Sequence, residues 1–411
     1  MRQALVLGAG MVGVSTALHL QARSWSVVLA DRQAPGRATS YGNAGIVQSE
    51  AVEPYAMPRD WPTLAAIATG RSNDVRWRPG ALLRQAGPLI RYWWHSHPAR
   101  HRRLAVDYAS IIAQASAEHR PLMIAAGADN LVRRDGFRIL HRRQEALDAA
   151  AREAEDLGQR FGIVSRILSA ADLMAAEPAL RSGGVGAVHW TDPWTVSDPG
   201  GLVSAYADLF GRRGGTILVS DAGTLRRAGK GWSIAGPDGP VEAEAAVVAL
   251  GPWSPELLRP FGLRLPMVKK RGYHRHWRAP RSLDLPLVDA ENGYVAAPME
   301  RGLRITSGAE LTAHDAPGTP VQLGRAEDAA RGLVDLGEPV EHEPWFGTRP
   351  CMPDMLPVVG AAPGLPGLWL HFGHGHQGFT LGPATARLLA ELMSDEAPYL
   401  PPEPFGPGRF G

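Results

Sequence analysis

A run of glycines near the amino terminus has the spacing of a phosphate-binding turn. Gly8, Gly10 and Gly13 stand between an apolar run at residues 3–7 and a stretch with helical spacing. The first glycine permits a tight turn, the second lets the backbone approach a pyrophosphate, and the third allows close contact between helix and strand. The amino terminus of the helix then offers free N–H groups to an anion. This arrangement predicts a dinucleotide-binding unit.

An acidic residue after a second apolar run extends the pattern. Residues 26–30 suit a buried strand and lead into Asp31, eighteen residues after Gly13. The Asp31 carboxylate can accept hydrogen bonds from ribose hydroxyls and would repel a 2′-phosphate, which argues against NADP. Glycines that serve only a tight turn are the alternative, and the motif alone does not separate FAD from NAD. The neighbouring positions expected to line the site are Met11, Val12 and Arg32.

Three segments further along the chain select FAD. The first is TSYGNAG at 39–45, the second is AVVALGPWS at 246–254, and the third joins GTRP at 347–350 to GHGHQGFTL at 373–381. In this order they resemble the D-amino acid oxidase superfamily of flavoproteins, and within it the small subunit of bacterial D-amino acid dehydrogenases. The resemblance covers nearly the whole chain. It implies an α/β fold that joins a Rossmann-like FAD-binding domain of the glutathione reductase type to an antiparallel-sheet substrate domain.

The resemblance also implies how FAD is held. Thr39 and Ser40 would contact the pyrophosphate or ribitol, while the strand near 219–222 would meet the adenine. The loop at 43–45 would lie along the flavin ring. The glycine loop at 373–378 would wrap its pyrimidine edge, ahead of a helix whose amino terminus favours the anionic reduced flavin. The other positions assigned to the non-covalently bound cofactor are Asn43, Ala44, Gly45, Ile46, Ala222, Gly251, Trp253, Gly373, His374, Gly375, His376, Gln377 and Gly378.

Arg349 is the first candidate for substrate recognition. The resemblance implies that it pairs with the substrate carboxylate, and its guanidinium fork suits a two-point bond. Tyr273 stands where relatives carry a tyrosine over the substrate, and a packed tyrosine is the alternative. Hydride would pass to flavin N5 from Cα of a D-amino acid, or of a cyclic imino acid such as D-proline or hydroxyproline. No acid or base is assigned, and the weaker candidates are His276, Tyr294 and Gln377.

Residues 56–110 depart from the pattern of such flavoproteins. Trp93 and Trp94 precede HSHPARHRR, a mixture of aromatic and basic residues that can sit at a membrane interface. The favoured interpretation is an amphipathic helix whose aromatic side packs on the core. The segment is also expected to cover the substrate pocket, which leaves the identity of the substrate open.

Close histidines and a single cysteine receive no chemical role. His371, His374 and His376 lack the further ligands that a metal needs, so no metal is expected. His314 is isolated and receives no role. Cys351 is the one cysteine of the chain, which excludes an internal disulfide and favours a small packed residue. It is not placed like the flavin-linking cysteine of sarcosine oxidases.

Length and composition describe an ordinary globular protein. The chain has 411 residues, of which 45% are hydrophobic and 20% charged. Its net charge of +2 is too small to attract nucleic acid to the molecule as a whole. No apolar run reaches the ~20 residues that span a bilayer. Cleavage of the first twenty residues as a signal peptide would remove the glycine motif, so a cytoplasmic protein is expected. Peripheral contact with the inner face of the membrane stays open.

The FAD-binding domain is expected to be discontinuous. Its expected parts are residues 1–55, 145–265 and 345–411, and the substrate domain is expected at 56–144 and 266–344. Alternating runs at 294–298 and 303–308 predict antiparallel strands. The segment GPDG at 236–239 predicts a hairpin turn, and the proline-rich residues 396–411 predict a tail.

The leading hypothesis is a flavin dehydrogenase that passes electrons to quinone or to a carrier protein. The nearest rival is an oxygen-using oxidase of the glycine or sarcosine type, and no short motif separates the two. A flavin subunit that acts mainly within a multi-subunit complex is a second alternative, and a pure NAD-binding module is a third.

Overall fold

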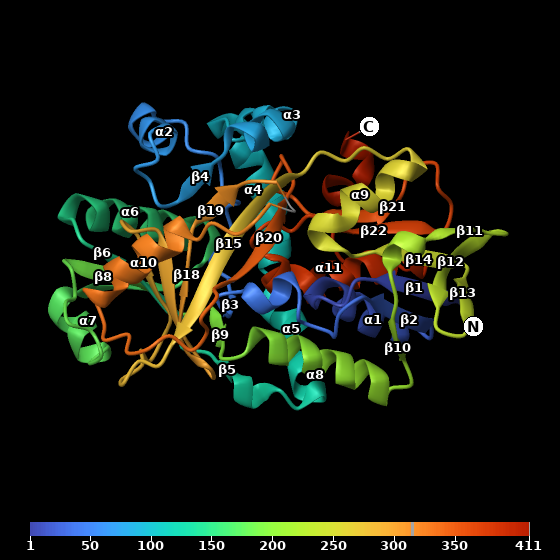
Figure 1. The fold of residues 1–411 in the computed structure, drawn as a ribbon, viewed down its shortest axis with the longest axis horizontal. Coiled ribbons are helices and arrows are strands. Elements are labelled where there is room, and N and C mark those ends of the chain that lie inside the picture. The colour runs from blue at the N-terminus through green and yellow to red at the C-terminus, as the bar shows by residue number, and fades with distance from the viewer. Residues whose placement is uncertain (314–315, 411) are drawn as a thin grey trace.

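The glycine motif begins a six-stranded sheet. The computed structural model describes residues 1–313 and 316–410, so His314 lies outside the described residues. The strand order is β10-β2-β1-β14-β22-β21, in which β21 is antiparallel and the others are parallel (Figure 1). The strands are β1 (Gln3–Leu7), β2 (Ser26–Asp31), β10 (Thr216–Val219), β14 (Ala245–Val248), β21 (Val358–Ala361) and β22 (Leu368–Phe372).

This sheet is covered on both faces, as its apolar strands require. On β1, Ala4 and Val6 belong to a core cluster shared with the helices, while Leu5 and Leu7 belong to a second cluster around Trp232. The helices on the first face are α1 (Met11–Gln21), α5 (Ala115–Ala126), α8 (Pro199–Arg212) and α11 (Gly378–Met393). The second face carries a small antiparallel sheet of β11 (Arg226–Ala228), β12 (Gly231–Gly236) and β13 (Gly239–Ala243). Burial of alternate side chains on opposite faces explains why β1 reads as a continuous apolar run.

A ten-stranded sheet forms the other half of the molecule. Its order is β4-β19-β15-β18-β17-β16-β6-β8-β7, and β20 pairs with the free edge of β15. The strands are β4 (Val75–Trp77), β6 (Phe137–His141), β7 (Ser165–Ser169), β8 (Gly186–Trp190), β15 (Val268–Trp277), β16 (Leu287–Asp289), β17 (Tyr294–Met299), β18 (Gly302–Thr306), β19 (Ala309–Leu311) and β20 (Trp345–Cys351). The nearby helices are α6 (Gln144–Phe161), α7 (Ala170–Ala176) and α10 (Val321–Arg331). A third sheet of β3 (Ile46–Val47), β9 (Trp194–Val196) and β5 (Val132–Arg133) lies between the halves.

Of three consecutive helices, the first two stand at the top of the view in Figure 1 and the third lies below them. They are α2 (Trp61–Ala68), α3 (Pro79–His95) and α4 (Pro98–Ile112). The expectation that the aromatic side of residues 77–103 packs on the core is only partly met. Tyr92 is buried and Trp77 packs partly buried against the same cluster, whereas Trp93 and Trp94 are 43% and 54% exposed. Trp61, on α2, is 83% exposed. No helix in the described part of the chain combines the length and apolar character that crossing a bilayer requires.

Several local predictions are confirmed, and two are corrected. The runs at 294–298 and 303–308 form the antiparallel pair β17–β18, and the turn at 236–239 joins β12 to β13. The predicted tail instead packs back on the protein, because Phe405 is buried and Arg409 Nε lies 2.6 Å from Asp354 Oδ2. The division at residue 145 also differs from the sheets, since β7 and β8 hydrogen-bond within the ten-stranded sheet.

The contact between α1 and its turn generates a first prediction. A Cβ atom on Gly13 would lie 1.8 Å from the carbonyl oxygen of Gly8, which is backbone and cannot rotate away. We expect Gly13→Ala to lower the free energy of unfolding by about 1–3 kcal/mol or more and to lower the flavin content of the purified protein. Thermal unfolding and the flavin-to-protein absorbance ratio measure both effects.

Gly211→Ala is the matched control, because a Cβ at this helical position of α8 meets nothing within 4 Å. We expect this variant to be neutral or stabilised by up to about 1 kcal/mol. Equal behaviour of the two variants would contradict the role given to Gly13.

Candidate active site

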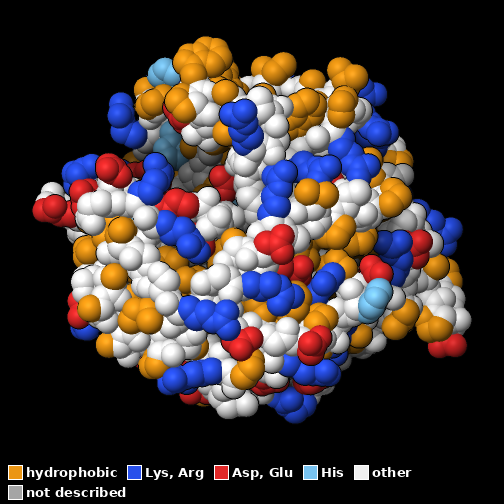
Figure 2. Space-filling view, turned by 60° about the vertical axis from the view of Figure 1, so that its left-hand side comes forward, with side chains coloured by type: hydrophobic (Ala, Val, Ile, Leu, Met, Phe, Trp, Pro, Cys, Tyr) orange, Lys and Arg blue, Asp and Glu red, His pale blue; other side chains and the backbone are white. Residues whose placement is uncertain are grey.

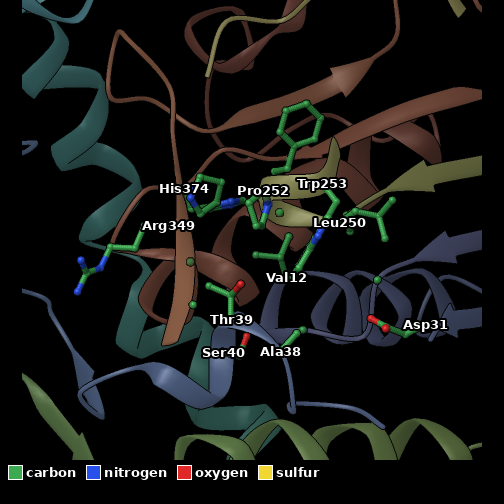
Figure 3. Close-up of a pocket in the computed structure, with 18 of the residues that line it drawn as sticks. Val12, Asp31, Ala38, Thr39, Ser40, Leu250, Pro252, Trp253, Arg349 and His374 are labelled. Carbon is green, nitrogen blue, oxygen red and sulfur yellow. The ribbon is translucent and has the colours of Figure 1, made fainter. Parts of the chain in front are cut away.

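One cavity of about 510 Å³ is lined by residues from both large sheets. Figure 3 shows Asp31 at one end and Arg349 at the other, with Thr39, Ser40 and His374 between them. The walls come from the carboxyl ends of β1 and β2, the turns after β14 and β22, and the pair β15–β20. Ligands of open parallel sheets bind at this edge, so the topology places the cavity where the glycine motif predicts it.

The Asp31 end of the cavity is held by backbone groups. Asp31 Oδ2 accepts a hydrogen bond from the Ala9 N–H at 2.7 Å, and Oδ1 accepts one from the Gln33 N–H at 3.0 Å. Each oxygen keeps a second lone pair for a ligand hydroxyl. The strand expected near 219–222 ends at Val219, and the turn that follows it, Ser220–Gly223, lines the cavity beside Asp31.

The middle of the cavity combines a helix terminus with a short hydroxyl-bearing turn. Thr39 and Ser40 lie on a 3-10 turn, and Ser40 Oγ accepts a hydrogen bond from the Met11 N–H of α1 at 3.0 Å. On the opposite wall, the chain turns at Gly251 with φ +54°. His374 completes this region, and burial lowers its pKa to about 3, so it is neutral at physiological pH.

The pair β15–β20 forms the wall at the far end. In its register Gly272 faces Gly347, His274 faces Trp345, and the last two rings stack with centroids 4.8 Å apart. Arg349 lies across Gly272, where a Cβ atom would come 2.7 Å from Nη2. Its guanidinium donates long hydrogen bonds of 3.3 and 3.4 Å to the carbonyl oxygens of Gly308 and Ser307. Donor capacity therefore remains for a ligand.

The role expected for the Tyr273 hydroxyl is corrected by the same register. Side chains alternate along a strand, so Tyr273 points to the face opposite Gly272. Its hydroxyl donates to Glu310 Oε2 at 2.5 Å and accepts from the Thr319 N–H at 3.0 Å. The ring is buried, with 2% exposed. Tyr273 contributes to the cavity wall, but its hydroxyl is committed elsewhere, so the packed alternative describes it better.

Most of the expected cofactor positions line the cavity. They are Gly8, Gly10, Met11, Val12, Asp31, Arg32, Thr39, Ser40, Asn43, Ala222, Gly251, Trp253, Gly373, His374, Gly375, His376 and Gly378. Those that do not are Gly13, Ala44, Gly45, Ile46 and Gln377. Gly13 acts through packing, and Ile46 pairs with Thr195 in the third sheet. The Asn43 side chain holds its own loop by accepting from the Gly45 N–H at 2.8 Å.

Some cavity residues were not singled out from the sequence. They include Ala38, Leu250, Pro252, Gly272, Trp345, Gly347 and Phe372. Leu250 and Pro252 lie inside the segment at 246–254, so the glycine turn in that segment could have identified them as cavity residues. No sequence pattern identifies Gly272 and Trp345 as cavity residues, because their place in the cavity wall depends on the pairing of two strands that are distant in the sequence.

The weaker candidates lie away from the main cavity. His276 Nδ1 lies 2.8 Å from Glu341 Oε1, and Tyr294 is buried on β17. Gln377 Nε2 donates to Gln48 Oε1 at 2.9 Å and lines a small adjoining cavity. His371, in contrast, lines the main cavity, and its Nδ1 lies 2.7 Å from the hydroxyl of Thr16.

The donors along the cavity fit FAD. A carboxylate at one end suits ribose hydroxyls, and the amino terminus of α1 beside Ser40 suits a pyrophosphate. Further along the cavity, the backbone turns at Gly251 and Gly373 line an uncharged region that suits the flavin ring. At the far end, the Arg349 guanidinium is placed to bind a carboxylate. Asp31, Ser40 and the 373–378 loop are therefore the residues that would hold the cofactor.

Comparison with known proteins defines the class. Residues 3–392 match the family described as DAO, FAD dependent oxidoreductase. A D-amino-acid oxidase of Bradyrhizobium diazoefficiens is 30% identical over 427 residues, covering 100% of this chain and 99% of the relative. A D-amino acid dehydrogenase of Cereibacter sphaeroides is 32% identical over 428 residues, covering 99% and 95%. The chain belongs to the DAO family of FAD-dependent oxidoreductases, and FAD is its cofactor.

Solved structures agree on the fold. Glycine oxidase from Geobacillus kaustophilus superimposes with a TM-score of 0.74 at 22% identity, over 99% of this chain and 98% of that one. L-proline dehydrogenase from P. horikoshii gives 0.70 at 16% identity, over 100% and 97%. The expected two-part flavoprotein fold is confirmed.

A buried carboxyl group near the cavity generates a pH prediction. Burial raises the pKa of Glu50 from 4.5 to about 7. Because the folded state favours the protonated form, stability is present in full below about pH 4.5 and is lost as the pH rises toward 7. Relative to Glu50→Gln, we expect the wild type to lose about 3 kcal/mol of unfolding free energy across this range.

Denaturant unfolding of the two proteins at pH 5 and pH 8 measures this difference. Glu242→Gln, on the exposed part of β13, is the control and should show no such change. A gap between wild type and Glu50→Gln that stays constant with pH would contradict the assignment.

Proposed function

We propose that this flavoprotein dehydrogenates a D-amino acid, or a cyclic imino acid of the D-proline or hydroxyproline type, at Cα. Arg349 carries the proposal, because it presents a guanidinium to the cavity with donor capacity to spare. The names of the two relatives, D-amino-acid oxidase and D-amino acid dehydrogenase, support an amino acid substrate.

The residues of the chain supply binding and orientation. FAD, when bound, would supply the acceptor for a hydride, that is, for one proton together with two electrons. Arg349 holds the substrate carboxylate at two points, which fixes the direction of the Cα–H bond. His374 is neutral and buried, so the wall beside it stays uncharged. The substrate amine must be neutral to form the imine, and water then hydrolyses the imine of a primary amine to a 2-oxo acid and ammonia.

An anaerobic titration tests this function. We expect a D-amino or imino acid, and not its L-enantiomer, to bleach the flavin absorption of the purified holoenzyme. Arg349→Met should lower kcat/KM about 100-fold, and Arg349→Lys should lower it less, because lysine keeps the charge without the fork.

Arg166→Met, on an exposed part of β7, is the control and should behave as the wild type. Bleaching that is equally fast in Arg349→Met would exclude Arg349 as the carboxylate ligand.

Non-covalent binding of FAD is also proposed, since burial raises the pKa of the Cys351 thiol and keeps it unreactive. Acid precipitation of the same holoenzyme should therefore leave the yellow colour in the supernatant.

The electron acceptor is proposed to be quinone or a carrier protein, reached at a membrane surface. Residues 75–106 contain seven arginines and three histidines but no aspartate or glutamate. Figure 2 shows hydrophobic and basic side chains side by side along the upper edge, where Figure 1 places α2 and α3. Arg59 lies 3.7 Å from the ring centroid of Trp93, and Arg100 lies 3.6 Å from that of Trp94. Exposed indoles beside cations suit an anionic interface.

Vesicle binding tests this surface. We expect the holoenzyme to sediment with vesicles that contain phosphatidylglycerol, and the variant Trp61→Ser/Trp93→Ser/Trp94→Ser to bind them at least about tenfold more weakly. The control is Val164→Ser/Ile167→Ser, which removes exposed apolar residues elsewhere. Binding that the triple variant retains would contradict the proposal, and turnover with oxygen as fast as with a quinone analogue would favour an oxidase.

A further inference from the structure

A second cation, Lys270, stands beside Arg349 on the β15–β20 wall, where it borders a small cavity that adjoins the main one. Lys270 is directly opposite Arg349 in the register of β15 and β20. Directly opposed residues of an antiparallel pair share one face, with Cα atoms ~4.5–5.5 Å apart, and the two charges are close enough to repel each other. Among residues 1–313 and 316–410, neither cation has a carboxylate within 4.0 Å.

The described residues around Lys270 offer its ammonium group a hydrogen bond but no carboxylate within 4.0 Å. Its Nζ lies 3.2 Å from the Tyr92 hydroxyl and 4.4 Å from the centroid of that ring. The hydroxyl donates its own proton to the Tyr55 carbonyl at 2.5 Å, so it acts as an acceptor for Lys270. Burial raises the pKa of Tyr92 and of the Cys351 thiol, and both are therefore neutral at physiological pH. An ammonium group in such a place lacks a counterion.

The preceding residue shows the contrast. Lys269 points to the other face of β15, and its Nζ lies 2.7 Å from Glu256 Oε1. Within residues 1–313 and 316–410, Lys269 thus has a carboxylate partner, and Lys270, which borders the small cavity, has none within 4.0 Å.

Lys270 borders a small cavity of about 30 Å³ that adjoins the main one. Tyr55, Tyr92 and Cys351 line it, and Gly373–His376 line both cavities. A buried water needs roughly 10–15 Å³ by a similar measure, so the space suits a group of two or three heavy atoms. A carboxylate has this size, whereas an aromatic ring does not.

We propose that Lys270 binds a second anionic group of the substrate, so that the preferred substrate is a short dicarboxylic D-amino or imino acid with its Cα carboxylate on Arg349. This inference rests on the proposed function and narrows it. The second carboxylate would accept a charge-assisted hydrogen bond from Nζ and supply the counterion that the wall lacks.

Ligand binding tests the inference without turnover. Glutarate and butyrate differ by one carboxylate, and each is titrated into oxidised holoenzyme while the flavin absorption spectrum is followed. We expect glutarate to bind at least about tenfold more tightly in the wild type. Lys270→Gln should bring the ratio close to one, Lys270→Arg should restore the preference, and Lys269→Gln should keep it. Equal binding of the two acids by the wild type would overturn the inference, as would a preference that survives in Lys270→Gln.

Anaerobic flavin reduction separates this inference from the function on which it rests. D-glutamate is compared with D-glutamine, which has the same shape without the charge, and we expect reduction to be at least about tenfold more efficient with D-glutamate. If no amino or imino acid reduces the flavin, the proposed function fails. If D-glutamine reduces it as well as D-glutamate does, only the role of Lys270 fails. A Lys270→Gln variant that slows only flavin reoxidation and keeps the diacid preference would also overturn that role.

Discussion

The register between β15 and β20 determines what the cavity presents to a ligand. Side chains alternate between the faces of a strand, so the pairing of Gly272 with Gly347 leaves room for the Arg349 guanidinium and the Trp345 ring to lie across these glycines, and it puts Lys270 beside Arg349. A shift by one residue would present the face that carries Tyr273. Because β15 pairs with β18 and β19 on its other edge, its position is fixed from both sides.

The same wall is tied to the dinucleotide-binding half by a few backbone contacts. The Gly375 N–H donates to the Pro350 carbonyl at 2.8 Å, and the Thr39 hydroxyl donates to the Thr348 carbonyl at 3.4 Å. The glycine loop after β22 and the turn after β2 therefore both take their positions from β20. Because of these contacts, the residues at the cofactor end and at the substrate end of the cavity are held in fixed positions relative to each other, although they are far apart in the sequence.

The sequence could predict the features that local interactions determine. The turn at Gly8, the helix after it and the acidic end of β2 follow from residues close together in the chain, and the fold class follows from their order with the later motifs. The face on which Tyr273 lies could not be predicted, because it depends on pairing with a strand more than seventy residues away. The exposure of Trp93 and Trp94 could not be predicted either, since a helical pattern shows that a helix has an apolar side but not whether another element covers that side.

The two cations on the β15–β20 wall point to ligand binding rather than to the stability of the free protein. Elsewhere some cations are paired with carboxylates, as Arg138 with Glu177 and Arg409 with Asp354, whereas the buried Arg304 donates to the carbonyl oxygens of Tyr41 and Asn43. On the β15–β20 wall, Lys270 and Arg349 stand close to each other without a carboxylate within 4.0 Å among the described residues, an arrangement that lowers the stability of the free protein. A fold that keeps such a pair of cations gains stability when an anionic ligand binds, because the ligand supplies the missing charge only to the folded state. Tight pairing of β15 on both edges is what allows the wall to hold this unfavourable arrangement in place before the ligand arrives.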